Sequence, residues 1–299
     1  ALGVTLVDLA VSPVTTSIRW AVGGNGLVLK TIDSGVTWFG ITSPVVGGSF
    51  LAVAANSESV LWIASASGVV YKSTDGGTTW STQTTGISTS IHTIKALSSS
   101  FVAAAGASGT VITTTNGGTI WTTVPTGSSA DLYGFDTASN EAAWVGGTAT
   151  AWVVGSSGTI RKTTNSGATW SAQTNVKDTL GADLTITNRT LYSMVVEDAN
   201  NVTMVGSSGL ILDTTDGGTT WNQKTSGVTV DLLTIGNDAL YAGSRIWVGG
   251  LVGTILTSTN GATTWALLTT NTVSEINTIV ASATNTATAV GEVETVILT

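Results

Sequence analysis

Short apolar stretches alternate with segments rich in glycine, threonine and asparagine, and the same order of stretches repeats seven times. Each repeat begins with two apolar residues three positions apart; the pairs are Leu6 and Leu9, Phe50 and Val53, Ile91 and Ile94, Leu132 and Phe135, Leu191 and Met194, Leu232 and Ile235, and Ile276 and Ile279. A second apolar stretch, a glycine turn and a third apolar stretch follow, as in WAVGGNGLVLK from Trp20. The period of two and the many β-branched residues predict strands and not helices.

An eight-residue string follows the third stretch in six of the repeats. It reads TIDSGVTW ending at Trp38, and its other copies end at Trp80, Trp121, Trp170, Trp221 and Trp265, at intervals of 41 to 51 residues. A period of this length is typical of propellers and other repeat folds.

The string has the residues of a tight turn between two strands. Its third position holds a short side chain that can accept backbone N–H bonds within its own turn, at Asp33, Asp75, Asn116, Asn165, Asp216 and Asn260. Glycine at the fifth position tolerates a positive φ angle, so we expect the most strained turn in the sixth copy, where Ala262 replaces it. The tryptophan that ends each copy is expected to pack between neighbouring units. We interpret these residues as structural.

Each repeat therefore predicts four antiparallel strands, and the chain as a whole predicts an all-β, seven-bladed β-propeller with four-stranded antiparallel blades. We expect residues 1–299 to form one domain, with repeats at about 5–42, 49–84, 90–125, 131–174, 190–225, 231–269 and 275–299. The seventh repeat supplies only three strands before Thr299. We expect residues 1–4 to complete this last blade as its fourth strand, which would remove an exposed sheet edge.

The string S/T-x-D-x-G-x-T-W resembles the Asp-box, or BNR repeat, found in sialidases, sortilin-type receptors and several glycosidases. We call the six copies the Asp-box strings, and the face of the fold on which they lie the Asp-box face. Together with the WAVG-x-x-G-x-I pattern upstream, the chain is most similar to propellers of the photosystem II stability and assembly factor type, over essentially its whole length. The resemblance implies the propeller fold; an assembly factor of this type would bind a membrane-protein partner. A propeller hosts many activities, so function must come from a site.

Composition and charge exclude some classes of partner and site. The formal charge is −8, only 9% of residues are charged, and the ten Lys and Arg residues are scattered, so we expect no nucleic-acid partner. No run of about 18 apolar residues is present, so we expect no transmembrane segment. The chain has no cysteine, which excludes disulfides and thiolate chemistry and leaves the compartment open.

We expect no enzyme, no cofactor and no metal. A sialidase-like site needs three converging arginines, whereas Arg19, Arg161, Arg189 and Arg245 fall at non-equivalent positions of the repeats. A single histidine, His92, cannot build a histidine-based metal site or a Ser-His-Asp triad.

The repeat alignment predicts a ring of polar residues around one mouth of the central channel. Its members precede the first apolar residue of each repeat: Thr5, Ser49, Ser90, Asp131, Thr190, Asp231 and Glu275. Three acidic and four hydroxyl side chains suit a cation or a polyhydroxylated ligand, although a hydrated rim is the interpretation we favour. We expect the connection from Asn175 to Arg189 to overhang this mouth and the insertion from Glu141 to Ala151 to lie on the opposite, Asp-box face.

Three functions remain open. The charge-poor composition favours a non-enzymatic structural or protein-interaction propeller of an exterior assembly, such as a virion capsid or tail protein or a secreted surface protein. The first alternative is a photosystem-type assembly factor in the periplasm or thylakoid lumen that binds a membrane protein. Such a factor would be expected to carry a basic patch, and the small number of Lys and Arg residues argues against this alternative. The second alternative is a glycan-binding or glycosidase-like propeller that uses the channel mouth.

Overall fold

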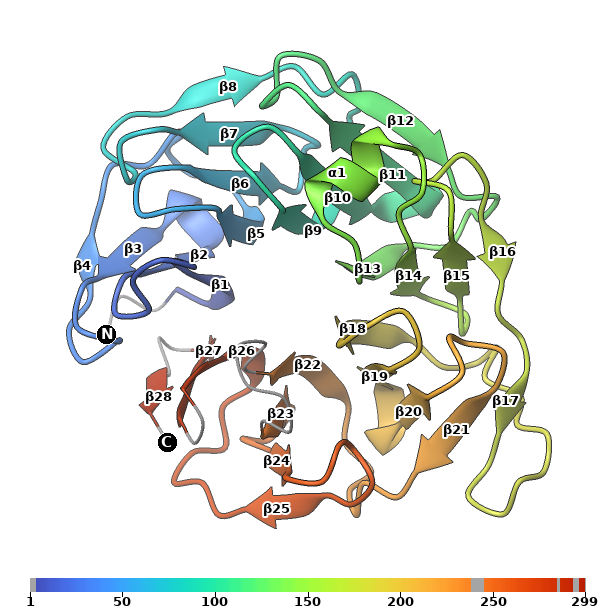
Figure 1. Cartoon of the computed structure of the whole chain (residues 1–299). Helices are drawn as coiled ribbons and strands as arrows, with labels where there is room; N and C mark the ends of the chain where they lie inside the picture. The colour runs from blue at the N-terminus through green and yellow to red at the C-terminus, as the bar shows by residue number, and fades with distance from the viewer. Residues whose placement is uncertain (1–3, 238–244, 284–285, 293–295, 299) are drawn as a thin grey trace.

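The computed structural model describes residues 4–237, 245–283, 286–292 and 296–298. Antiparallel sheets stand around a central channel, and the chain passes from the channel outwards within each sheet (Figure 1). No helix in the described ranges is long and apolar enough to span a membrane.

The strands occupy four concentric positions. The innermost strands, which line the channel, are β1 (Leu6–Val11), β5 (Phe50–Ala55), β9 (Ile91–Ala96), β13 (Leu132–Thr137), β18 (Leu191–Val196), β22 (Leu232–Asn237) and β26 (Ile276–Ala283). The second strands are β2 (Arg19–Gly23), β6 (Leu61–Ser65), β10 (Val102–Gly106), β14 (Ala151–Gly155), β19 (Val202–Gly206), β23 (Ile246–Gly250) and β27 (Thr286–Gly291). The third strands are β3 (Val28–Thr31), β7 (Val70–Ser73), β11 (Thr110–Thr114), β15 (Ile160–Thr163), β20 (Ile211–Thr214), β24 (Ile255–Ser258) and β28 (Val296–Leu298). The outer strands are β4 (Phe39–Gly40), β8 (Ser81–Gln83), β12 (Thr122–Pro125), β16 (Ser171–Ala172), β21 (Trp221–Lys224) and β25 (Ala266–Leu268).

The prediction of seven four-stranded blades is wrong. The described chain has six blades with four antiparallel strands each, which we number 1 to 6 in chain order; in blade 5, β17 (Val176–Lys177) adds a short parallel strand at the outer edge. The strands β26, β27 and β28 form a three-stranded sheet between blade 6 and blade 1. The fourth strand predicted for this sheet has no counterpart among the described residues. The predicted closing strand falls on residues 1–4, of which 1–3 lie outside the described residues. Val4 belongs to no strand and lies against Gly24 of its own blade.

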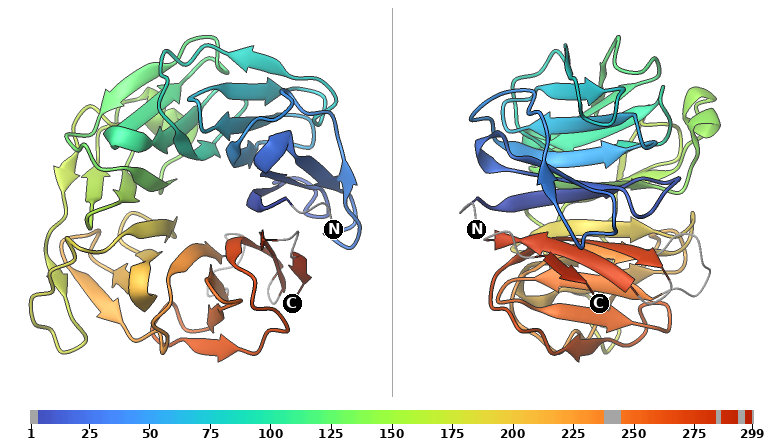
Figure 2. Two further views of the ribbon diagram at one scale, coloured as in Figure 1. Left: turned by 180° about the vertical axis from the view of Figure 1, so that it is seen from behind. Right: turned by 90° about the vertical axis from the view of Figure 1, so that its left-hand side faces the viewer.

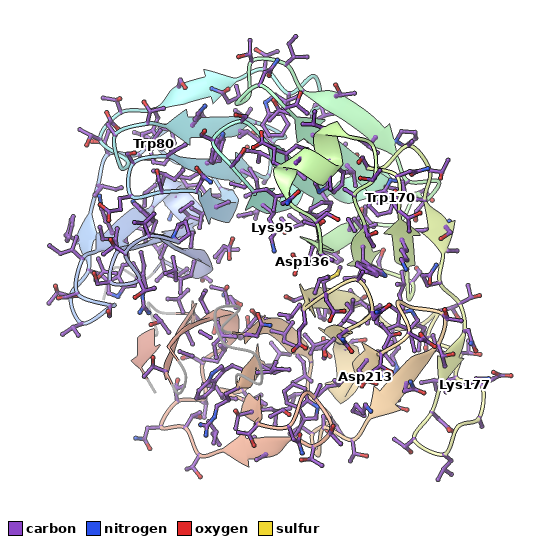
Figure 3. The ribbon with its side chains drawn as sticks, in the orientation of Figure 1. Trp80, Lys95, Asp136, Trp170, Lys177 and Asp213 are labelled. Carbon is purple, nitrogen blue, oxygen red and sulfur yellow. The ribbon has the colours of Figure 1, made fainter. Side chains whose placement is uncertain are left out.

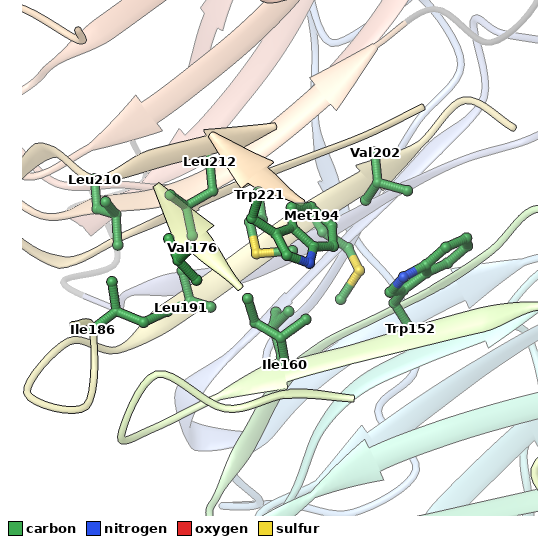
Figure 4. Packing of buried hydrophobic residues seen from close by; sticks show 12 residues of the cluster. Trp152, Ile160, Val176, Ile186, Leu191, Met194, Val202, Leu210, Leu212 and Trp221 are labelled. Atoms are coloured by element: carbon green, nitrogen blue, oxygen red, sulfur yellow. The ribbon is translucent and has the colours of Figure 1, made fainter. Parts of the chain in front are cut away.

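The core lies between the sheets. Every residue of the second strands in blades 1 to 6 is buried, because both faces of these strands pack against neighbouring sheets. Figure 4 shows one such interface, in which Trp152 of blade 4 packs near Met194 and Trp221 of blade 5. The tryptophans that end the Asp-box strings contribute to these interfaces, with Trp121 and Trp221 fully or almost fully buried.

The six Asp-box strings share one set of hydrogen bonds. The carboxylate of Asp75 accepts from the backbone N–H of Thr79 at 2.8 Å, and the hydroxyl of Ser73 accepts from that of Gly77 at 2.9 Å. The corresponding bond to the third residue of the other strings ranges from 2.8 to 3.0 Å. The side chains thus satisfy the backbone donors of a turn that has two successive residues at positive φ.

Candidate binding site at the channel mouth

A β-bulge in every innermost strand builds the mouth of the channel. The pairing of each innermost strand with its second strand skips one residue, directly after the first residue of the strand. The skipped residues are Val7, Leu51, His92, Tyr133, Tyr192, Leu233 and Asn277. A bulge re-aims side chains, and all seven of these residues line one cavity of about 450 Å³.

Blades 3, 4 and 5 give this cavity an aromatic side. The imidazole of His92 stacks on Tyr133 with ring centroids 4.8 Å apart and an interplanar angle of 7°. Tyr133 in turn packs against Tyr192, with centroids 5.8 Å apart. The Tyr192 hydroxyl donates to Asp231 Oδ2 at 3.2 Å, which holds that ring in place. The three rings thus pack on one another in a row along one side of the cavity, which we call the aromatic arc.

The charges around the cavity are negative. Asp8 and Glu275 line it, and no lysine or arginine is among its lining residues. Burial, and then the nearby carboxylate of Asp131, raise the pKa of Tyr133, while burial lowers the pKa of His92. The aromatic arc therefore carries no positive charge near neutral pH.

A second cavity of about 310 Å³ continues the channel towards the Asp-box face. Lys95 and Asp136 form an ion pair there, and Asp136 Oδ2 also accepts from the backbone N–H of Val196 at 2.9 Å (Figure 3). Asp8 lines both cavities. Burial raises its pKa to about 6, although backbone N–H groups of Val53 and Leu9 donate to it and oppose this rise.

The predicted polar ring lies mostly behind the cavity. Thr5 and Glu275 line it. Asp131 and Asp231 instead accept from the backbone N–H groups of Ser108 and Ser208, in the glycine turns of the preceding blades, at 2.9 and 2.8 Å. The remaining ring residues also contact glycine turns. The Ser90 hydroxyl donates to the carbonyl of Ala66 in the preceding blade, whereas the carbonyls of Ser49 and Thr190 accept from the backbone N–H groups of Ala66 and Ser207 in their own blades. Ligand binding by this ring stays a prediction.

Sequence reasoning missed the bulge residues. Each of them lies two positions after a member of the predicted polar ring. One signal was available: six of the second strands end in glycine, and glycine within a strand pattern indicates a bulge or a close backbone approach. At Gly155 a Cβ atom would lie 1.9 Å from the carbonyl oxygen of Asp131, so the backbones can cross there only without a side chain.

The two candidate loops lie on different parts of the molecule. The connection from Asn175 to Arg189 does not overhang the mouth as predicted: its strand β17 (Val176–Lys177) pairs in parallel with β21 at the outer edge of blade 5 (Figure 1). The reason is its buried Val176, which packs into the interface between blades 4 and 5. The insertion Glu141–Ala151 forms the short helix α1 (Glu141–Val145), which projects from one face of the ring (Figure 2, right). Ser166 of the Asp-box string in blade 4 donates to Ala143, which places α1 on the Asp-box face as predicted.

The arginines do not converge. Arg19 donates to Thr288 of the three-stranded sheet, Arg161 and Arg189 donate to carbonyls of turns, and Arg245 lies over Trp247. Within the described ranges, no group of three His, Asp or Glu side chains is arranged to hold a metal ion.

A family model described as photosynthesis system II assembly factor YCF48 matches residues 182–297, which is less than half of the chain. Among solved structures, one described as YCF48 bound to D1 peptide has a TM-score of 0.76 and 18% identity, over 99% of this chain and 91% of that one. YCF48 from Cyanidioschyzon merolae has a TM-score of 0.75 and 17% identity, over 99% and 95% of the two chains. An ancestral GH74 enzyme is more distant, with a TM-score of 0.63 and 16% identity, over 83% of this chain and 35% of that one. No curated protein matches the sequence.

Identities this low show the fold alone, whereas the family model is a match of sequence. The family model leads away from the exterior-assembly hypothesis: the interpretation of the chain as a structural protein of a virion or an extracellular surface is wrong, and the sequence match favours the photosystem-type alternative. The solved structures agree with that alternative in fold. The scarcity of Lys and Arg was a poor argument against that alternative, because a propeller can present aromatic and acidic side chains to a partner just as well.

Proposed function

We propose that this chain is a non-enzymatic assembly factor that binds a peptide segment of a membrane protein of the photosystem II type, in the thylakoid lumen or periplasm. The match of residues 182–297 to the YCF48 family model carries the proposal. The peptide-bound YCF48 structure, which shares the fold over 99% of this chain, supports a peptide as the ligand.

The mouth of the channel is the surface we propose for this peptide. Its cavity of about 450 Å³ falls in the range of ligand pockets, about 300–1,000 Å³, and accepts a side chain but not a folded domain. The aromatic arc offers rigid rings, which are the side chains that dominate binding energy at protein interfaces.

Biolayer interferometry with biotinylated peptides that tile the extramembrane segments of D1 tests the proposed function. We expect one segment to bind with a dissociation constant at or below about 100 μM, as in weak but specific recognition. A scrambled peptide of the same composition is the control. If no D1 segment binds better than its scrambled form, the proposal is wrong.

A further inference from the structure

The cavity at the channel mouth is chemically two-sided. The aromatic arc comes from blades 3, 4 and 5, whereas Asp8 comes from blade 1 and Glu275 from the three-stranded sheet. These two groups of elements face each other across the ring (Figure 1). A ligand group that enters the mouth therefore meets flat rings on one side and carboxylates on the other.

Two cationic side chains of blades 3 and 5, Lys95 and Arg189, are already engaged elsewhere. Lys95 lines only the second cavity and is paired with Asp136. A guanidinium N–H of Arg189 donates a hydrogen bond to the carbonyl of Ser207 in a glycine turn. Asp131 and Asp231, directly behind the tyrosines, add negative charge, and low-dielectric walls strengthen its field in a cleft.

We propose that this cavity binds the guanidinium group of an arginine side chain in the partner's peptide, packed against the aromatic arc and paired with the carboxylates across the mouth. A guanidinium is planar, so it can lie against these rings while its edge donates several hydrogen bonds. A lysine ammonium is compact and strongly hydrated, and would use the rings less well. The identity of the partner in this inference rests on the proposed function. The inference adds the side chain of the partner that the channel mouth selects.

The single histidine of the chain gives a direct probe, because His92 is part of the aromatic arc. Titration with N-acetyl-arginine methylamide, followed by NMR, reads the one imidazole Hε1 signal of the protein. We expect a saturable shift of this signal. N-acetyl-citrulline methylamide has the same shape without the charge and should leave the signal in place. Equal shifts with both compounds, or no shift with either, would overturn the inference.

Two variants separate a site from a non-specific charge effect. Tyr133→Leu removes the central ring of the aromatic arc and Glu275→Gln removes a lining carboxylate. We expect each variant to weaken arginine binding at least fivefold. Glu141→Gln, on α1 at the other face, changes the net charge equally and should change the affinity less than twofold. Circular dichroism confirms folding; Glu275→Gln still decides the question if Tyr133→Leu does not fold. Equal affinity of Glu275→Gln and Glu141→Gln would contradict the proposal.

The peptide experiments distinguish this inference from the proposed function. If a D1 segment binds and its affinity survives replacement of each arginine by citrulline, the assembly function stands and the guanidinium site is wrong. If the arginine amide binds at the mouth and no D1 segment does, the guanidinium site stands and the assembly function is wrong.

Discussion

At the scale of single residues, a tryptophan and a lysine connect successive blades. Trp62 on β6 and Lys72 on β7 are opposite each other, and the lysine Nζ lies 5.2 Å from the centre of the indole ring. The same Nζ donates at 2.8 Å to the carbonyl of Gly117, in the Asp-box of the next blade. Equivalent pairs extend from blade 1 to blade 2 and from blade 4 to blade 5. Each lysine thus serves both as a cation over an aromatic ring and as a donor to a turn.

The variant Lys72→Met keeps the apolar stem and removes both interactions. We expect it to lower the free energy of unfolding by about 1–2 kcal/mol. The variant loses a cation–π contact and a hydrogen bond from a charged donor, and burial of the methionine thioether offsets part of this loss. Urea unfolding measures the change. Lys177→Met removes only the salt bridge to Asp183, whose carboxylate side chain is 88% exposed, and should lower the free energy of unfolding far less than Lys72→Met does. Equal effects of the two variants would refute the role of the tryptophan.

Asp8 contributes a pH dependence of its own. Its folded-state pKa, raised from 3.8 to about 6 mainly by burial, exceeds the unfolded value, so the folded protein holds this proton more tightly. Its contribution to stability is therefore fully present below about pH 3.8 and is lost as the pH rises through about 6. Two pKa units correspond to about 3 kcal/mol.

Replacing Asp8 with asparagine should remove this dependence. The difference in unfolding free energy between the native protein and Asp8→Asn should fall by about 2–2.5 kcal/mol from pH 4 to pH 7, as measured by urea unfolding at both pH values. Glu275, Lys95 and Asp136, which line the same channel, remain in both proteins. Asp33→Asn is the opposite case, because hydrogen bonds from Thr37 lower the pKa of Asp33 to about 2. The difference in unfolding free energy between the native protein and Asp33→Asn should therefore change only below about pH 4. If the difference for Asp8→Asn is constant from pH 4 to pH 7, the pH dependence predicted for Asp8 is wrong.

At the scale of elements, the Asp-box turns explain why local patterns predict the strands so well. The hydroxyl, carboxyl or amide group and the glycines that shape each turn all lie within eight consecutive residues, and the alternation of each strand is local too. The features that sequence reasoning missed depend on contacts between distant segments. Val176 in β17 pairs with Trp221 of the next repeat, and the bulge at Tyr133 depends on the approach of Gly155 to Asp131. For this reason the turns were predictable, whereas the side chains that enter the mouth were not.

The sixth Asp-box shows how a turn adapts to a missing glycine. The fifth position has φ between 83° and 95° in the glycine-containing turns but 61° at Ala262, which is the value that residues with a side chain tolerate best in this region. The strain expected at Ala262 is thus partly relieved by a shift of the backbone. The methyl group is buried between blades 5 and 6, which offsets part of the remaining cost.

Exchanging alanine and glycine at this position should have unequal effects in two blades. At Gly77, with φ 94°, a Cβ atom would lie 2.4 Å from Ile41 Cδ1, so we expect Gly77→Ala to cost about 1–3 kcal/mol. Ala262→Gly relieves a mild strain but loses a buried methyl group, and should change stability by less than about 0.5 kcal/mol. Thermal and urea unfolding of both variants test the asymmetry, which similar losses in both would disprove.

At the scale of the whole molecule, the ring is joined where the three-stranded sheet meets blade 1. Asn277 donates from β26 to the carbonyl of Leu6 at 2.8 Å, next to the channel. Farther out, the buried guanidinium of Arg19 donates to Thr288 Oγ1 on β27 and to the carbonyl of Thr16 at 3.0 Å. Polar side chains thus reinforce the junction between the two ends of the repeat array.

A double-mutant cycle on Arg19 and Thr288 measures how much this junction stabilises the ring. Arg19→Met leaves the Thr288 hydroxyl, which is 0% exposed, without that donor, and should lower the free energy of unfolding by about 2–3 kcal/mol. Thr288→Val removes the acceptor, and the cycle should give a coupling energy of about 1–2 kcal/mol, because the two groups are in direct contact. Hydrogen exchange should accelerate first in β1 and β27 of the Arg19→Met variant if the ring opens at this junction. Additive effects of the two substitutions would show that closure of the ring does not depend on this pair. Exchange that accelerates evenly over all sheets would show that the junction is no weaker than any other blade interface.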